Sequence, residues 1–266
     1  LEGAQKAGLY REDWGKWEDM LSHIPPYPVN ADGAVAEWIH PFFEDHYSHR
    51  HQSHIYPVFP GDEVTRDRDP ALFQAFCTAI EKRLSIGISA QTSWSFAHMA
   101  CVYARMEQGG MALECLENLA RVCVMNNFFT VHNDWRCMGV GMDMPRAPFQ
   151  IDANMGFTAA INDMLLLSED NCLHLLPALP PAWTAGEIAG IAAKGGIAAD
   201  IGWDRRKGLV RLTLRAKKDA CIDLLLPGEI VRACMDGCAL PCRGRRVPGL
   251  TLVASRPQTL DIALCL

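Results

Sequence analysis

The sequence predicts an α+β protein in which a helical part precedes a small antiparallel β domain. Up to about Ser168, apolar residues recur every three or four positions, which is the period of a helix. After Ser168 they alternate with other residues at every second position, which is the period of a half-buried strand. A proline-rich stretch, Leu176 to Pro181, lies near the change. We therefore expect a helical domain over residues 1–172 and a β domain over residues 173–266.

Five helices are expected in the first part. The first carries Trp14, Trp17 and Leu21 on one face and ends before the prolines at 25 and 26. The second begins at Asp69-Pro70, since Asp is a good N-cap and Pro fits the first turn. Apolar spacing predicts three more helices, at residues 94–106, 113–123 and 157–165. Gly109-Gly110 is expected to break the first of these three.

The β domain is expected to contain at least five strands. In the first, Ile197, Ala199 and Ile201 alternate with more polar neighbours. Turn residues such as Pro227-Gly228 and Pro248-Gly249 separate the later strands. The strands are expected at residues 197–203, 209–215, 221–226, 250–254 and 260–264.

Composition narrows the class of protein. With 25 Lys and Arg against 31 Asp and Glu, the net charge of −6 gives no reason to expect nucleic acid as a partner. No apolar run approaches the roughly 20 residues that span a membrane, so no membrane partner is expected either. No phosphate-binding, dinucleotide-binding or serine-hydrolase motif occurs, and we expect no cofactor. The 11 cysteines, several at apolar positions, favour free thiols and a reducing compartment.

Two connections in the helical part, residues 25–62 and 126–153, are long for a globular domain. Long ordered loops usually carry function. These two loops contain most of the residues that could perform chemistry.

The first loop is rich in histidine. Five of the nine histidines lie between His40 and His54, with His46, His49 and His51 among them. One interpretation is a metal site, but the spacing matches no standard set of ligands and we expect no metal. Histidines that line a polar cleft and bind hydroxyl groups are the favoured interpretation, and ordinary loop histidines are the alternative.

Glu37 lies in the short apolar stretch before these histidines. A carboxyl group beside Trp38 would be desolvated, and desolvation raises the pKa of a carboxyl towards neutrality, as a proton donor requires. The alternative is a glutamate in the first turn of a helix, where it would complement the helix dipole.

Asp152 comes just before the fifth expected helix and is either a plain N-cap or an ionised carboxylate that accepts a proton from water. Arg136 and Arg146 could keep it charged. Trp135 offers an aromatic face for stacking on a sugar, although it could equally belong to the core.

Glu37 and Asp152 together are typical of glycoside cleavage. One carboxylic acid protonates the leaving oxygen while the other carboxylate helps a water molecule attack from the opposite face.

At these positions the chain resembles the C-terminal part of the glycoside hydrolase family 95 α-L-fucosidases. Four blocks carry the resemblance in the order of the family, and shorter matches follow at residues 173–180 and 195–196. The blocks are residues 25–38 (PPYPVN to AVAEW), 49–61 (HRHQSHIY to PG), 92–95 (TSWS) and 148–156 (PFQIDANMG).

The resemblance implies an (α/α)6 toroid followed by a β-sandwich-like domain, and an inverting hydrolase that removes terminal α-linked L-fucose, or L-galactose in some relatives, from oligosaccharides. It implies Glu37 as general acid and Asp152 as part of the base system, where asparagine side chains help to activate water. The side chains expected to contact the sugar are His49, His51, His54, Trp94, His132, Trp135, Arg146 and Asn154.

The chain also departs from the family. A toroid has twelve helices and five are recognised here, so we expect an incomplete toroid that lacks the segment with the asparagines. Arg146-Ala147 stands where the family commonly has a histidine, and Met155 replaces an aromatic residue. A non-catalytic remnant that binds sugar or a partner is therefore the second hypothesis.

Two further expectations concern behaviour rather than chemistry. An incomplete toroid would expose helix faces, and we expect self-association through them. The cellular location stays open, because the family is often exported while free cysteines favour the cytoplasm.

Overall fold

Helices and strands occupy separate halves of the chain in the computed structural model, which describes residues 1–265. The helices are α1 (Glu2–Ala7), α2 (Trp14–Ser22), α3 (Pro70–Ser85), α4 (Ser93–Arg105), α5 (Gly109–Cys123) and α6 (Ile151–Leu165). The strands are β1 (Leu166–Glu169), β2 (Cys172–Leu175), β3 (Ala185–Ala193), β4 (Ile197–Asp204), β5 (Leu209–Ala216), β6 (Ala220–Leu225), β7 (Ile230–Met235), β8 (Cys238–Ala239), β9 (Arg246–Leu252) and β10 (Gln258–Leu264). None of the described helices is both long and apolar enough to cross a membrane.

All five expected helices are confirmed, and their caps explain where they begin. Asp69 caps α3 by accepting a hydrogen bond from the Leu72 amide at 3.0 Å, and Pro70 occupies the first turn. Thr92 and Ser95 cap α4 reciprocally. The short α1 was not expected.

The role of Gly109-Gly110 differs from the expectation. The two glycines begin α5 rather than break α4, which has already ended at Arg105. A side chain on Gly109 would meet the carbonyl oxygen of Ala178 at 2.2 Å, so glycine is required for this close contact between α5 and the chain entering the β domain.

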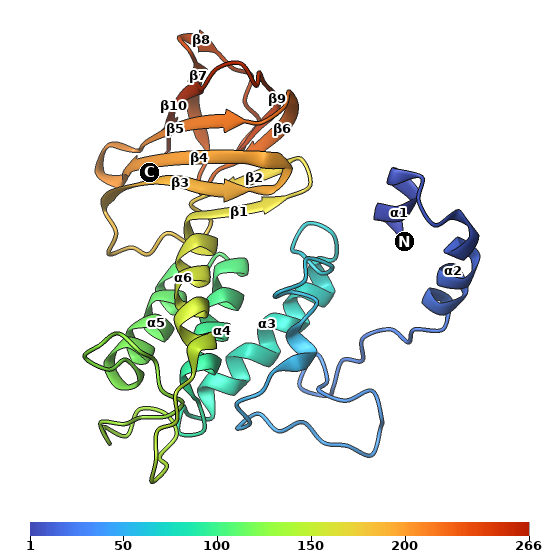
Figure 1. Cartoon of the computed structure of the whole chain (residues 1–266), viewed down its shortest axis with the longest axis vertical. Helices are drawn as coiled ribbons and strands as arrows, with labels where there is room; N and C mark the ends of the chain where they lie inside the picture. Colours follow the sequence, from blue (N-terminus) through green and yellow to red (C-terminus); the bar gives the residue numbers. More distant parts are fainter. Residues whose placement is uncertain (266) are drawn as a thin grey trace.

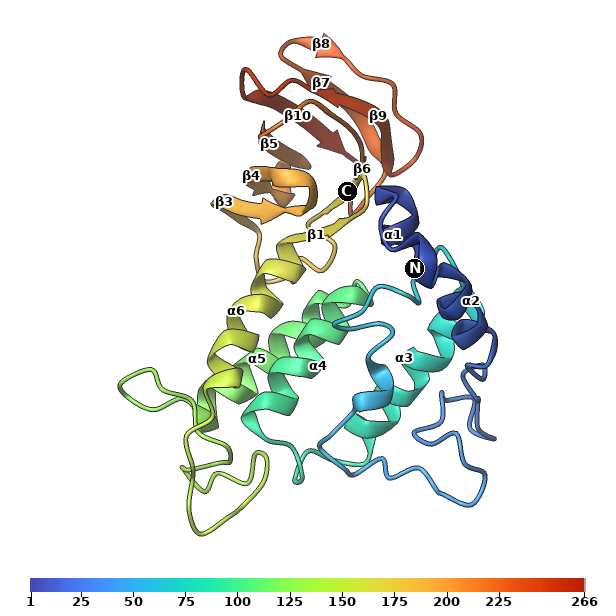
Figure 2. The ribbon, with the colours of Figure 1, turned by 45° about the vertical axis from the view of Figure 1, so that its right-hand side comes forward.

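The helices α3 to α6 share one core. α4 packs between α5 and α6, and it is buried nearly all round, as its composition predicts. Phe76 and Ile80 of α3 join Met99 and Tyr103 of α4 in the same apolar cluster. Figures 1 and 2 show these helices beneath the β domain, with α6 leading directly into β1.

The β domain is a sandwich of two sheets. One sheet has the strand order β1-β2-β6-β9 and the other β3-β4-β5-β10-β7-β8. Alternate residues of β5, Val210, Leu212 and Leu214, point into the core between the sheets, where they join Leu224 of β6 and Leu252 of β9. The sandwich and the five expected strands are therefore confirmed.

Two expectations about the β domain need correction. The sheets are not entirely antiparallel, because β2 pairs with β6 in parallel. The crossover that parallel pairing needs is supplied by β3 to β5, which lie in the other sheet. In addition, β1 begins at Leu166 and continues α6 without a linker, so the expected boundary between residues 172 and 173 falls inside β2.

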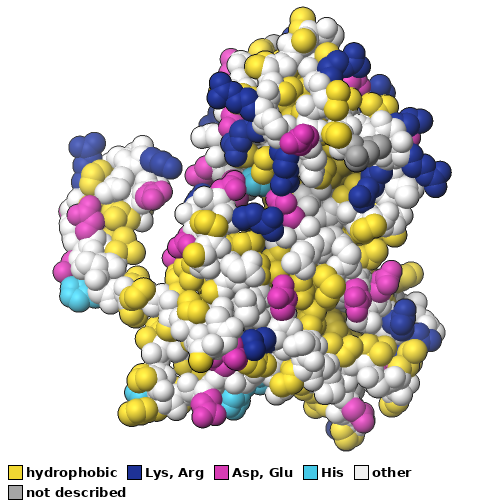
Figure 3. Space-filling view, turned by 180° about the vertical axis from the view of Figure 1, so that it is seen from behind, with side chains coloured by type: hydrophobic (Ala, Val, Ile, Leu, Met, Phe, Trp, Pro, Cys, Tyr) yellow, Lys and Arg dark blue, Asp and Glu magenta, His cyan; other side chains and the backbone are white. Residues whose placement is uncertain are grey.

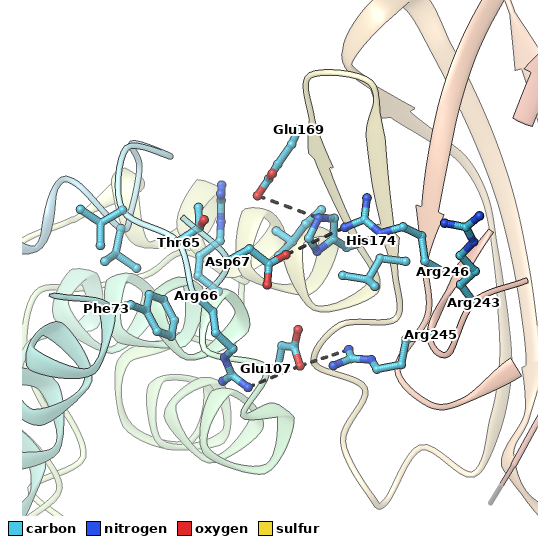
Figure 4. A pocket seen from close by; sticks show the side chains of 15 residues that line it. Thr65, Arg66, Asp67, Phe73, Glu107, Glu169, His174, Arg243, Arg245 and Arg246 are labelled. Carbon is cyan, nitrogen blue, oxygen red and sulfur yellow. Dashed lines mark hydrogen bonds and ion pairs between the residues drawn. The ribbon is translucent and has the colours of Figure 1, made fainter. Parts of the chain in front are cut away.

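Charged side chains meet where the helices and the β domain face each other. A cavity of about 330 Å³ lies there, and Figure 4 shows the ion pairs that line it. Glu107 lies 4.0 Å from Arg66 of the helical part and 3.2 Å from Arg245 of the β domain. Asp67 lies 4.0 Å from Arg246. None of the expected site residues lines this cavity, so we assign it to the interface.

The N-terminal segment with α1 and α2 has no buried residue and stands off the body in Figures 1 and 3. An ion pair of 3.9 Å between Lys6 and Asp170 links it to the β1–β2 turn. Apolar side chains of this segment are more than half exposed: Leu9, Tyr10, Met20, Leu21 and Ile24.

The two glycines of α5 give a matched test of the close contact with Ala178. We expect Gly109→Ala to lower the free energy of unfolding by about 1–3 kcal/mol, because the new methyl group collides with backbone. Gly110→Ala, which meets nothing within 4 Å, should be neutral or stabilise by up to about 1 kcal/mol. Urea unfolding of both variants measures this, and equal midpoints would contradict it.

The exposed apolar residues of the N-terminal segment predict self-association. We expect the mean mass of the chain in multi-angle light scattering to rise with concentration, and the double change Met20→Glu and Ile24→Glu to reduce the rise. A monomer mass at all concentrations would show that these side chains do not drive association.

Candidate active site

Glu37 lies in the irregular part of the 25–62 loop, and its carboxylate is almost buried. One of its oxygens, Oε2, accepts hydrogen bonds from Arg83 Nη2 at 3.0 Å and from the His46 amide at 3.1 Å, and 11% of the side chain is exposed. The alternative of a first-turn helical glutamate is wrong, because no helix begins here. Trp38 itself is half exposed, and its ring lies 5.5 Å from that of Phe43 at an angle of 60°.

Arg83 is the neighbour of Glu37 that the sequence analysis missed. It is fully buried, and its guanidinium also donates to the backbone carbonyls of His46, His49 and His51 at 3.2, 2.8 and 3.4 Å. The signal was present in the sequence, because Arg83 follows Phe76 by seven positions and Ile80 by three, which places an arginine on the apolar face of α3.

A second polar group holds the backbone at Glu37. Asp45 accepts a hydrogen bond from the Glu37 amide and another from the Asn30 side chain. Asn30 in turn donates to Tyr47 at 2.8 Å. The position of Glu37 is thus fixed through both its backbone and its carboxylate.

Asp152 lies in the first turn of α6. The interpretation of Asp152 as the N-cap is wrong, because the N-cap position is occupied by Gln150. Gln150 also determines where α6 begins relative to α4, because its side-chain oxygen accepts from Ser93 Oγ at 2.6 Å and from the Trp94 amide at 3.0 Å. The close approach continues at Gly156, where a side chain would meet the Trp94 ring at 3.0 Å. The PFQIDANMG block therefore brings Asp152 and Trp94 to neighbouring helix starts.

A cavity of about 340 Å³, here called the histidine cavity, opens between the 25–62 loop and α4. Two of the expected side chains, His51 and Trp94, line it, together with residues that the sequence analysis did not select. Its lining residues are Arg50, His51, Gln52, Ser53, Tyr56, Phe59, Pro60, Trp94 and His98.

Gln52 is the most informative of these additions. It is 5% exposed, and within residues 1–265 neither its amide nitrogen nor its amide oxygen has a hydrogen-bond partner. A buried amide without partners costs free energy, so Gln52 is an unsatisfied polar group in the wall of the cavity.

The histidines around the cavity are held neutral. Burial lowers the pKa of His51, and the nearby charges of Arg50 and His132 lower it further. Burial lowers the pKa of His98 and of His54 to about 4 in each case, and Arg83 adds to the effect at His54. Neutral imidazoles both donate and accept hydrogen bonds, as recognition of hydroxyl groups requires.

Each candidate carboxylate neighbours one of these histidines. Glu37 raises the pKa of His54, against the larger effect of burial. Asp152 raises the pKa of His132, again against burial and against the nearby charge of Arg50. Arg50 and Asp152 thus act in opposite directions on the same histidine, whereas Arg136 donates to the carbonyl of Arg121.

Six of the eight expected sugar contacts lie outside the cavity wall, His54 and His132 among them. Asn154 uses its amide to hold the backbone at Phe128 and Thr130. Trp135 donates to the carbonyl of Val124 at 3.3 Å, and Arg146 is exposed. The His49 ring lies 5.1 Å from the His51 ring, tilted by 55°. Their roles in binding stay predictions.

No group of three or more His, Cys, Asp or Glu side chains in residues 1–265 is arranged to hold a metal ion. The crowded histidines point to several different partners, because His51 lines the cavity, His54 faces Glu37 and His46 contributes its backbone.

The low pKa of His98 predicts a specific loss of stability in acid. In the unfolded chain this histidine titrates near 6.5 and in the folded chain near 4, so its contribution is complete above about pH 6.5 and is lost as the pH falls towards 4. The loss should be on the order of 2–3 kcal/mol. We expect the midpoint of urea unfolding to change less between pH 7 and pH 4 in His98→Gln than in the unchanged chain.

His23→Gln is the matched control, because the His23 side chain is 75% exposed on the segment after α2. A pH dependence that is unchanged in His98→Gln, or equally flattened in His23→Gln, would contradict the assignment.

Comparison with known proteins agrees with this architecture. The family model described as the glycosyl hydrolase family 95 catalytic domain matches residues 1–165, and that described as the glycoside hydrolase family 95 C-terminal domain matches residues 167–235. The two matches meet where α6 passes into β1.

Individual relatives point the same way. The chain is 32% identical to Alpha-L-fucosidase 2 of Arabidopsis thaliana over 201 residues, which are 71% of this chain and 22% of that protein. It is 26% identical to Probable alpha-fucosidase A of Aspergillus oryzae over 232 residues, or 79% of this chain and 31% of that protein. The chain thus spans less than a third of the length of these relatives.

A GH127 β-L-arabinofuranosidase from Geobacillus stearothermophilus T6 is a solved structure similar to 75% of the chain, at 14% identity and a TM-score of 0.35 over 39% of that protein. Because the catalytic-domain model matches well over half of the chain, and the C-terminal model follows it directly, the chain belongs to glycoside hydrolase family 95.

Proposed function

We propose that the chain carries the acid side of an inverting glycosidase site that removes terminal α-linked L-fucose, or L-galactose, from oligosaccharides. The observation that carries the proposal is the histidine cavity, in which Trp94 and neutral His51 offer stacking and a hydrogen bond to one sugar ring. The names of the relatives supply the sugar. The helices would then form part of an (α/α)6 toroid.

In this proposal Glu37 is the general acid. It gives its proton to the glycosidic oxygen while the bond from that oxygen to the anomeric carbon breaks, and the leaving sugar departs as an alcohol. A water molecule attacks the anomeric carbon from the opposite face, and the Asp152 side of the site takes its proton. The remaining expected contacts, His54, His132, Trp135, Arg146, Asn154 and His49, would orient the sugar.

A second function, sugar binding without turnover, is favoured by one observation. The resemblance implies that asparagine side chains help Asp152 to activate water, but Asn154, two positions along α6, holds the backbone at Phe128 and Thr130 instead. Such a chain would bind fucose in the same cavity and leave the glycosidic bond intact.

Substitution of the proposed acid tests the first function. We expect Glu37→Gln to lower turnover of a fucosyl oligosaccharide at least 10²-fold, since general acid catalysis contributes about 10²–10⁴-fold, and to leave the dissociation constant for the sugar within a few-fold. Glu44→Gln, an exposed acid of the same loop, is the matched control. Proton NMR of the first product measures turnover and should show the inverted anomer.

The outcomes separate the two functions. Turnover that survives in Glu37→Gln would remove this residue as the acid. Fucose binding by the unchanged chain without any release of product would favour the binding function. Absence of both binding and turnover would contradict both.

A further inference from the structure

Arg83 donates four hydrogen bonds at the candidate site. It projects from α3 and is fully buried, yet all of its acceptors lie in the 25–62 loop. They are the Glu37 carboxylate and the carbonyls of His46, His49 and His51. One cation therefore binds the proposed acid and the backbone beside the wall of the histidine cavity.

We propose that Arg83 is a positioning residue that orients Glu37 for proton transfer and fixes the acid relative to the histidine cavity. The proposal rests on the proposed function, because it assigns a role within that reaction. Arg83 acts through Glu37 and touches no sugar itself.

The contacts distinguish the two oxygens of Glu37. Oε2 accepts from Arg83 Nη2 at 3.0 Å and from the His46 amide at 3.1 Å. Oε1 has no hydrogen-bond partner within residues 1–265. The oxygen that is free to carry a proton to the leaving group is thus Oε1, and the orientation of Oε1 follows from the two bonds to Oε2.

The charge of Arg83 acts on both states of Glu37: in the resting site it favours the ionised carboxylate, against the protonated form that a general acid needs, and during the step it favours release of the proton. When the proton leaves Oε1 for the glycosidic oxygen, the Glu37 carboxylate becomes negative. A guanidinium that is already in place and shielded from water stabilises this charge as it develops, without reorganisation. Asp45, Tyr47 and His54 are the other titratable groups that face Arg83 and Glu37.

The shape of arginine is needed for the second part of the role. The planar guanidinium offers five N–H groups, and here Nη1 points to the three carbonyls while Nη2 binds Glu37. Because the 46–51 backbone leads to His51 in the cavity wall, the acid and the wall are fixed to the same group. A lysine has one nitrogen and could not reach both sets of acceptors.

Substrates with different leaving groups test this role. A 4-nitrophenyl fucoside releases a stable phenolate that needs little protonation, whereas a fucosyl oligosaccharide releases a sugar that needs a full proton. We expect Arg83→Met to lower kcat about 10²-fold on the oligosaccharide and less than about 10-fold on the nitrophenyl fucoside, with little change in KM. Arg83→Lys should be intermediate on the oligosaccharide.

Arg105→Met is the matched control. Arg105 forms a part-buried ion pair with Asp163 at 3.2 Å between α4 and α6, and its guanidinium lies 5.8 Å from the Phe59 ring, but it has no hydrogen bond to Glu37 or to the 46–51 backbone. Its removal should change both substrates by the same factor. Equal losses on both substrates in Arg83→Met, or no loss on either, would overturn the proposal.

Hydrogen–deuterium exchange separates failure of this proposal from failure of the proposed function. Amides of residues 45–52 should exchange at least 10-fold faster in Arg83→Met than in the unchanged chain or in Arg105→Met. Unchanged exchange overturns the structural role of Arg83, whatever the activity. A third outcome is that the unchanged chain hydrolyses neither substrate while exchange still rises in Arg83→Met. The proposed function and the catalytic role of Arg83 would then both be contradicted, whereas its effect on the loop would stand.

Discussion

The buried guanidinium of Arg83 is the interaction on which the geometry of the candidate site depends. The 25–62 loop contains no α-helix and one short 3-10 turn, so its own backbone hydrogen bonds do little to define its path. Burying a cation is costly unless its donors find partners, and the partners of Nη1 and Nη2 are carbonyls and a carboxylate of that loop, whereas Nε has no hydrogen-bond partner within residues 1–265. Removal of one partner of such a buried pair costs about 3–5 kcal/mol, which makes other loop conformations unfavourable.

Gln150 plays the corresponding role on the other side of the site. By accepting from both Ser93 and Trp94, it joins the first turn of α6 to the first turn of α4. The aromatic face of Trp94 and the carboxylate of Asp152 therefore come from helices whose starts are bonded together. At Glu37 as at Asp152, a single polar side chain, remote in sequence from its acceptors or donors, fixes the backbone that carries the candidate carboxylate.

Local signals in the sequence were sufficient for most of the fold and insufficient for the site. The caps at Asp69 and Thr92 and the alternation in β5 act over a few residues, so α3, α4 and β5 could be predicted. β3 consists largely of Ala and Gly at the edge of a sheet and lacks alternation, and the parallel pairing of β2 with β6 joins distant segments. Likewise, Glu37 and Arg83 are 46 positions apart, and the helix and strand periods in a sequence say nothing about contacts over that distance.

The β domain supports the site without contributing a residue to the histidine cavity. α4 runs from that cavity, where Trp94 and His98 lie, to the interface with the β domain. At the interface end, Glu107 lies between Arg66 and Arg245, and Gly109 packs directly on Ala178. These contacts fix the turn between α4 and α5. Because α4 is a rigid helix buried on nearly all sides, fixing one of its ends restricts the other, where the sugar is proposed to bind.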